Sequence, residues 1–149
     1  MSAGYVTAHL DAIEPIVFDS DDEPDWKPLR NDLGSGAFGV NAWVAPVAGH
    51  QAIERHDEVP EEGGASGHEE LYVVHGGAAR FTVGDEQFDA PAGTLVFVAD
   101  PSLTREAVAT EPQTTVLVVG AARVVALEPS DWETRWLRKL GRVSGGDAG

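Results

Sequence analysis

The sequence has 149 residues, no cysteine and a formal net charge of −15, which together exclude several classes of function. The lack of cysteine rules out disulfides, thiol catalysis and cysteine-bound zinc or iron–sulfur clusters. The acidity argues against nucleic acid and anionic membrane surfaces as partners, because both are bound through clustered Lys and Arg.

The length suits a single globular domain with one core of ordinary size. No run approaches the ~20 apolar residues that span a bilayer, and no basic start precedes an apolar segment as in a signal peptide. We therefore expect a cytoplasmic protein. Residues 1–37 are the least regular part and predict an N-terminal arm, in which Trp26 and Leu29 pack back onto the body.

Short apolar runs separated by Gly and Pro predict about nine β-strands in the middle of the chain. Thr114 to Val119 is a continuous apolar run, as in a buried strand, whereas the other runs are shorter or alternate. Such a series favours an all-β barrel or sandwich. The predicted strands are 38–44, 50–58, 70–74, 79–83, 87–89, 94–98, 104–109, 114–119 and 123–127.

The chain changes its periodicity after residue 128, where the pattern predicts a helix. Ser130 and Glu133 have the spacing of a capping box, in which each side chain bonds the backbone N–H of the other. Trp132, Trp136 and Leu140 form an apolar stripe, which we expect to pack on the barrel or on a second subunit. We divide the chain into an arm (1–37), a barrel (38–127), a helix (128–143) and a disordered tail (144–149).

Two stretches resemble the sequence motifs of the cupin superfamily. Glu69-Glu70-Leu71-Tyr72-Val73-Val74, followed by Gly77, is similar to the first cupin motif, with Glu70 at the position of its metal-binding Glu. The run from Pro91 to Val98 is similar to the start of the second motif. The resemblance, which spans about residues 38 to 120, implies an RmlC-like double-stranded β-helix, or jelly-roll barrel, with an internal pocket. It also implies a homodimer.

The usual metal ligands of that family are mostly missing from this chain. The resemblance implies three His and one Glu, with two of the His in a His-x-His just before the Glu. Those positions hold Gly64 and Ser66, or Gly63 and Ala65, and Thr104 stands where the third His is expected. Thr is a poor ligand for a transition metal. We therefore expect neither the standard site nor a cofactor.

A variant metal site is the alternative. His56 and Glu58 are two apart in a predicted strand and so point to the same face. If that face is the barrel interior, they could join Glu70 and His68 around iron, manganese, nickel or zinc. This requires His56 and Glu70 to lie within roughly 6 Å, the span of two ligands with ~2 Å bonds. Otherwise His56 and Glu58 form a hydrogen-bonded or surface pair near the barrel mouth.

These positions define a predicted pocket and leave several functions open. The leading hypothesis is a small-molecule-binding barrel without the standard metal site and of unknown reaction. The alternatives are a metal-dependent dioxygenase, isomerase or lyase, a metal-free acid/base enzyme using His56 and Tyr72, or an interaction module that binds through the Trp-bearing helix. Arg80 and Arg105 are candidates to neutralise the pocket carboxylates. The predicted pocket residues are Glu54, His56, Glu58, Glu70, Tyr72, Val96, Val98 and Thr104.

Overall fold

The computed structural model describes residues 4–20, 22–60, 67–122 and 128–142. The predicted strand at 123–127, the tail at 144–149 and most of the loop predicted at 59–67 lie outside these ranges. The elements in chain order are a short helix η1 (Leu10–Ala12), β1 (Asp25–Lys27), α1 (Leu29–Leu33), β2 (Gly39–Ala45), β3 (Gln51–His56), β4 (His68–Gly76), β5 (Ala78–Val83), β6 (Glu86–Pro91), β7 (Leu95–Val98), β8 (Arg105–Ala109), β9 (Thr114–Ala122) and α2 (Asp131–Lys139).

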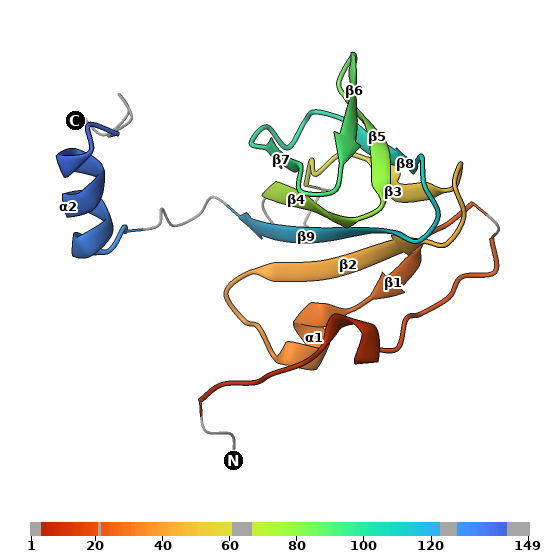
Figure 1. Cartoon of the computed structure of the whole chain (residues 1–149), viewed down its shortest axis with the longest axis horizontal. Coiled ribbons are helices and arrows are strands. Elements are labelled where there is room, and N and C mark those ends of the chain that lie inside the picture. Colours follow the sequence, from red (N-terminus) through yellow and green to blue (C-terminus); the bar gives the residue numbers. More distant parts are fainter. Residues whose placement is uncertain (1–3, 21, 61–66, 123–127, 143–149) are drawn as a thin grey trace.

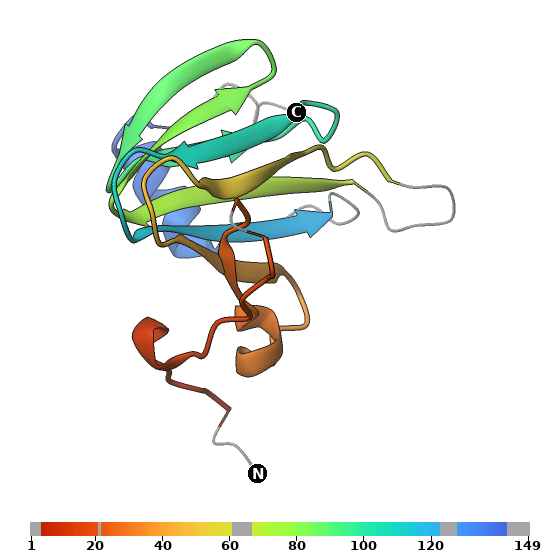
Figure 2. The same cartoon turned by 90° about the vertical axis from the view of Figure 1, so that its right-hand side faces the viewer.

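Two antiparallel sheets face each other across one core (Figure 1). The five-stranded sheet has the order β1-β2-β9-β4-β7 and the four-stranded sheet the order β3-β8-β5-β6. Strands that are distant in sequence therefore lie side by side. For example, β9 pairs with β2 on one edge and with β4 on the other. Seen from the side, the sheets form the two walls of a flattened barrel (Figure 2). The all-β jelly roll with a short C-terminal helix is confirmed.

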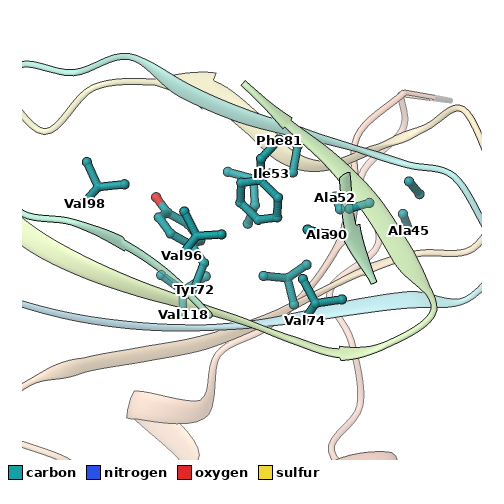
Figure 3. Packing of buried hydrophobic residues seen from close by; sticks show 14 residues of the cluster. Ala45, Ala52, Ile53, Tyr72, Val74, Phe81, Ala90, Val96, Val98 and Val118 are labelled. Atoms are coloured by element: carbon teal, nitrogen blue, oxygen red, sulfur yellow. The ribbon is translucent and has the colours of Figure 1, made fainter. Parts of the chain in front are cut away.

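The core lies between the sheets and follows the two-residue period of the strands. On β4, Tyr72 and Val74 are buried, whereas His75 is exposed on the other face, as its alternation predicts. Phe81 of β5 lies at the centre of the cluster, edge-on to Tyr72 at 5.8 Å and stacked on Phe88 at 5.9 Å (Figure 3). The hydroxyl of Tyr72 points toward the end of the cluster where Val98 lies. That end carries the polar residues of the cavity.

Gly77 closes β4 in a position that no other residue could occupy without strain. Its φ is +71°, and an added Cβ would lie only 2.8 Å from Thr114 Cα. The hydroxyl of Thr114 donates to Ala78 O at 3.0 Å and accepts from Ala78 N at 3.2 Å. The Gly of the first motif therefore lets the β4–β5 turn pack directly on the start of β9.

The N-terminal arm packs on the body through Trp26 and Leu29, as predicted. Trp26 stacks on Trp43 at 6.0 Å and donates from its indole Nε1 to Asn41 Oδ1 at 2.8 Å. Leu29 is buried, and Lys27 donates from Nζ to Leu10 O at 2.8 Å. Residues 25–27 also pair with β2 and extend the five-stranded sheet. The arm thereby fixes the strand that supplies two residues to the cavity.

The C-terminal helix α2 stands apart from the two sheets (Figure 1). None of its residues is buried, and Trp132 and Trp136 are 62% and 49% exposed. The stripe therefore does not pack on the barrel of its own chain, and the other expectation, packing on a second subunit, stays a prediction. Ser130 makes no side-chain cap, so the capping box is also not formed. No helix in the described ranges is long and apolar enough to cross a membrane.

Candidate functional site

The candidate site lies at one end of the barrel, where β3 ends and β4 begins. His56 is the last residue of β3 and Glu58 follows two residues later. The backbone N–H of Glu58 donates to Pro101 O at 2.8 Å, which holds this segment against the β7–β8 turn. Glu70 lies on β4, with only 8% of its surface exposed. Three segments thus bring a His and two Glu to one point.

A cavity of about 260 Å³ opens beside these side chains. It is slightly smaller than the ~300–1,000 Å³ typical of drug-sized ligand sites, so it suits a small molecule. Its lining combines apolar and aromatic side chains with carboxylates and an imidazole. The lining residues are Asn41, Trp43, Ile53, Glu54, His56, Glu58, Glu70, Tyr72 and Val118.

The imidazole of His56 is oriented by a backbone carbonyl two residues earlier in β3. Its Nδ1 lies 2.7 Å from Glu54 O, and because a carbonyl only accepts, Nδ1 must carry the proton. Its Nε2 faces the carboxylates, 3.3 Å from Glu58 Oε1 and 3.8 Å from Glu70 Oε2. In the neutral ring Nε2 therefore presents a lone pair to the site. Metal-binding His residues usually show this arrangement, with the other ring nitrogen donating to a carbonyl or carboxylate.

Glu70 is held from two sides. Tyr72, two residues along the same face of β4, donates its hydroxyl to Glu70 Oε2 in a short hydrogen bond. On the neighbouring strand, Gly120 lies opposite Glu70, and an added Cβ there would be 3.3 Å from Glu70 Cγ. The absence of a side chain at Gly120 leaves the space that the Glu70 side chain occupies.

The pKa values of Glu58 and Glu70 are shifted in opposite directions. Burial disfavours the charge of Glu70, but hydrogen bonds with His56, Tyr72 and Glu58 outweigh it and lower the pKa of Glu70 to about 2. Burial, together with the adjacent Glu70, raises the pKa of Glu58. The hydrogen bond with Glu70 outweighs partial burial and raises the pKa of His56. The negative charge of Glu70 thus favours the protonated forms of both His56 and Glu58.

The same three residues have the chemistry and spacing of a metal site. One ligand atom from each of His56, Glu58 and Glu70 lies within 4.8 Å of the other two. His56 Nε2 lies 3.8 Å from Glu70 Oε2, which is inside the predicted limit of roughly 6 Å and also within the ~4 Å that two ~2 Å bonds to one metal can span. His68, the fourth candidate, has Nδ1 3.6 Å from Glu58 Oε2 and so lies next to this group. The group could hold a metal ion.

Of the eight predicted pocket residues, five line the cavity and three do not. Val96 and Val98 belong to the buried core. Thr104 precedes β8, and its carbonyl accepts from Gly84 N at 2.8 Å. The first inward position of β8 belongs instead to Arg105, which is fully buried. The one-residue difference moves the side chain of Thr104 away from the interior.

Four residues line the cavity that the sequence did not predict, namely Asn41, Trp43, Ile53 and Val118. Asn41 and Trp43 alternate with Val40 and Ala42 on β2, so the period-two pattern could have placed them on the inner face. Strict alternation along β3 would turn Ile53 away from the face of Glu54 and His56. The register of β3 against β8 shifts on both sides of Ile53, which lets Ile53 and Glu54 both line the cavity. Such a bulge has no clear signal in the sequence.

Solved structures resemble this one at low sequence identity. A cupin protein from Bacteroides fragilis matches with a TM-score of 0.63 and 17% identity over 88% of this chain and 94% of that chain. A sugar phosphate isomerase of the cupin superfamily from Silicibacter pomeroyi matches with a TM-score of 0.60 and 20% identity, over 78% and 75% of the two chains. This chain has the cupin fold.

A further structural neighbour is a predicted oxalate decarboxylase from Thermotoga maritima, with a TM-score of 0.61 and 15% identity. The match covers 78% of this chain and 99% of that chain. No protein-family model matches the sequence, and no curated protein does. The cupin fold is thus established by structure, while the activity has to be argued from the site.

Proposed function

We propose that this cupin-fold protein binds a small molecule in the barrel cavity, beside a divalent cation held by His56, Glu58 and Glu70. The observation that carries the proposal is the convergence of three ligand atoms within 4.8 Å. The orientation of His56 supports it, because the bond from Nδ1 to Glu54 O leaves Nε2 for the cation. One His and two Glu would here take the place of the standard three His and one Glu, of which this chain keeps only the Glu, Glu70. Iron, manganese, nickel and zinc all accept such ligands.

The remaining cavity residues would bind and orient the molecule. Trp43 and Ile53 provide an apolar wall that excludes water. Asn41 uses its Oδ1 to accept from Trp26, which leaves its NH₂ group as a donor for a ligand. Tyr72 keeps its proton, because burial and the charge of Glu70 raise its pKa. A bound cation would polarise a carbonyl or carboxyl oxygen of the ligand as a Lewis acid.

An isomerase or lyase reaction at this site is the second candidate. The specific observation in its favour is the opposite shift in the pKa values of Glu58 and Glu70, because such splitting is how one site holds both an acid and a base. An isomerase and a predicted decarboxylase among the neighbours agree with this, although one fold hosts many activities. In this account Glu58, whose pKa is raised, would act as the acid, and Glu70, whose pKa is lowered, as the ionised base.

Calorimetry on the full-length protein, first stripped of metal with a chelator, tests the cation site. We expect one Mn²⁺ or Zn²⁺ to bind per chain. Glu70→Gln should weaken this binding at least ~10-fold, since even indirect partners of a metal contribute 10–100-fold. Glu86→Gln removes an exposed carboxylate on β6 and should leave binding unchanged.

Two results would contradict the proposal. One is that none of Mn²⁺, Fe²⁺, Ni²⁺ and Zn²⁺ binds the wild-type chain. The other is binding that Glu70→Gln and His56→Ala both leave intact, which would place the cation elsewhere. His75→Ala, which alters an exposed His on β4, is the control for His56→Ala.

A further inference from the structure

Arg105 is a buried cation without a carboxylate partner in the part of the chain that the structure describes. Its side chain is fully buried, and within the same ranges its Nε and Nη1 have no hydrogen-bond partner. Its Nη2 donates to Asp100 O at a long 3.4 Å. Among the described residues no carboxylate forms an ion pair with it. Fully buried Arg residues are rare unless they are paired, because removing the charge from water is costly.

The position of Arg105 is next to the cavity. It is the direct partner of His56 across the β3–β8 pairing, and directly paired residues lie on the same face of a sheet. On β8 it alternates with the buried Ala107 and Ala109, so its side chain points into the barrel. Burial and Glu70 raise the pKa of Tyr72, and the charge of Arg105 partly offsets that rise. The guanidinium therefore lies close enough to act on a residue that lines the cavity.

The N–H donors of Arg105 without acceptors indicate which kind of ligand could bind to it. A guanidinium offers five N–H donors in a planar fork and accepts no hydrogen bond. The fork matches the two oxygens of a carboxylate or a phosphate, which gives short and strong paired hydrogen bonds. An oxyanion would supply both the missing charge and the missing acceptors at Nε and Nη1.

We propose that Arg105 recognises an oxyanion, so that the ligand of this cavity is a small carboxylate or phosphate compound. The inference deepens the proposed function and rests on the cavity being a ligand site, but it does not require the cation. Arg105 has no exposed surface, so the oxyanion reaches it only when the side chains between it and the cavity move aside. Arg80, by contrast, faces solvent beside Asp89 and does not belong to this site.

Thermal unfolding of the metal-free, full-length protein tests this inference. Sodium phosphate and sodium acetate are each titrated against sodium chloride at constant ionic strength. At a concentration of an anion about fivefold above its Kd, the wild-type Tm should rise by about 2–4 °C. Arg105→Met should abolish this rise, while its own Tm in chloride stays equal to or above that of the wild type, because a buried unpaired charge is removed.

The controls separate a specific site from a general salt effect. Arg80→Met removes an exposed Arg outside this site and should keep the full anion response. A non-specific effect of phosphate would instead raise the Tm of the wild type and of all the variants alike. Arg105→Lys keeps the charge but loses the fork, so its response should fall by more than half. If Arg105→Met does not fold, Arg105→Lys gives the same comparison.

The outcomes are distinct for the two proposals. A wild-type chain that responds to neither anion, or an equal response in the wild type and the Arg105 variants, overturns the role of Arg105. A response to phosphate alone or to acetate alone supports it and identifies the oxyanion. Cation binding by Arg105→Met, measured by calorimetry, reports separately on the site at His56, Glu58 and Glu70.

Discussion

At the scale of single residues, the ionisation of Glu70 links the site to the stability of the fold. Its pKa of about 2 lies below the ordinary value of 4.5, so the folded chain binds fewer protons there than the unfolded chain. The free energy of unfolding from this residue is therefore fully present above pH 4.5 and is lost as the pH falls toward 2. Tyr72 and His56 supply the bonds that cause the shift.

This shift predicts the pH profile of Glu70→Gln. At pH 7 the variant should unfold with a free energy about 1–3 kcal/mol below that of the wild type. The difference should shrink between pH 4.5 and 2, because protonation then removes the same charge from the wild type. Urea unfolding at a series of pH values measures it. A difference that stays constant down to pH 2.5 would show that the ionised carboxylate does not stabilise the fold.

At the scale of elements, the approach of β9 to β4 sets the space for Glu70. Gly120→Ala should therefore disturb the site, because the new Cβ would be 3.3 Å from Glu70 Cγ. The hydrogen bonds of Glu70 with its neighbours keep that side chain from moving aside. We expect a loss of about 1–2 kcal/mol in the free energy of unfolding and weaker cation binding. Urea unfolding and calorimetry measure the two effects.

Gly76→Ala is the matched control for this prediction, since an added Cβ at Gly76 meets no atom within 4 Å. It should change stability by less than about 0.5 kcal/mol. If Gly120→Ala is as stable as the wild type and binds the cation equally well, Glu70 has more freedom than its contacts indicate.

The strands near the site also show what the sequence could and could not predict. The pattern of β4 placed Glu70 and Tyr72 on one inner face, because strict alternation leaves little choice of register. Ile53 points inward because of a bulge in β3. Arg105 points inward because β8 begins at that residue. Both depend on pairing with other strands, so local sequence does not reveal them.

At the scale of the whole molecule, motif resemblance predicted the jelly roll, whereas the order of its strands comes from long-range pairing. The first motif located Glu70 and Gly77 correctly within β4 and its turn. The expectation that no metal binds rested on the missing His residues and is still untested. The alternative ligands His56, Glu58 and Glu70 come from β3, the segment after it and β4. The sequence could suggest this set, but only the pairing of distant strands brings the three side chains together.

The detached helix leads to a prediction for the whole chain. Removing residues 129–149 should change the Tm of the barrel by less than about 2 °C, because no residue of α2 is buried. Differential scanning calorimetry measures this. A fall of more than about 5 °C would mean that the Trp stripe packs on a barrel in solution.

The homodimer stays a prediction, and light scattering on the same two samples, the full chain and the truncated chain, tests it.

The most direct measurement is the anomalous scattering of a crystal soaked with Mn²⁺ or Zn²⁺. The account predicts one strong peak about 2.0–2.3 Å from His56 Nε2 and from a carboxylate oxygen of each of Glu58 and Glu70. Clear electron density for these three side chains with no peak between them, or a peak only at the surface, would contradict it.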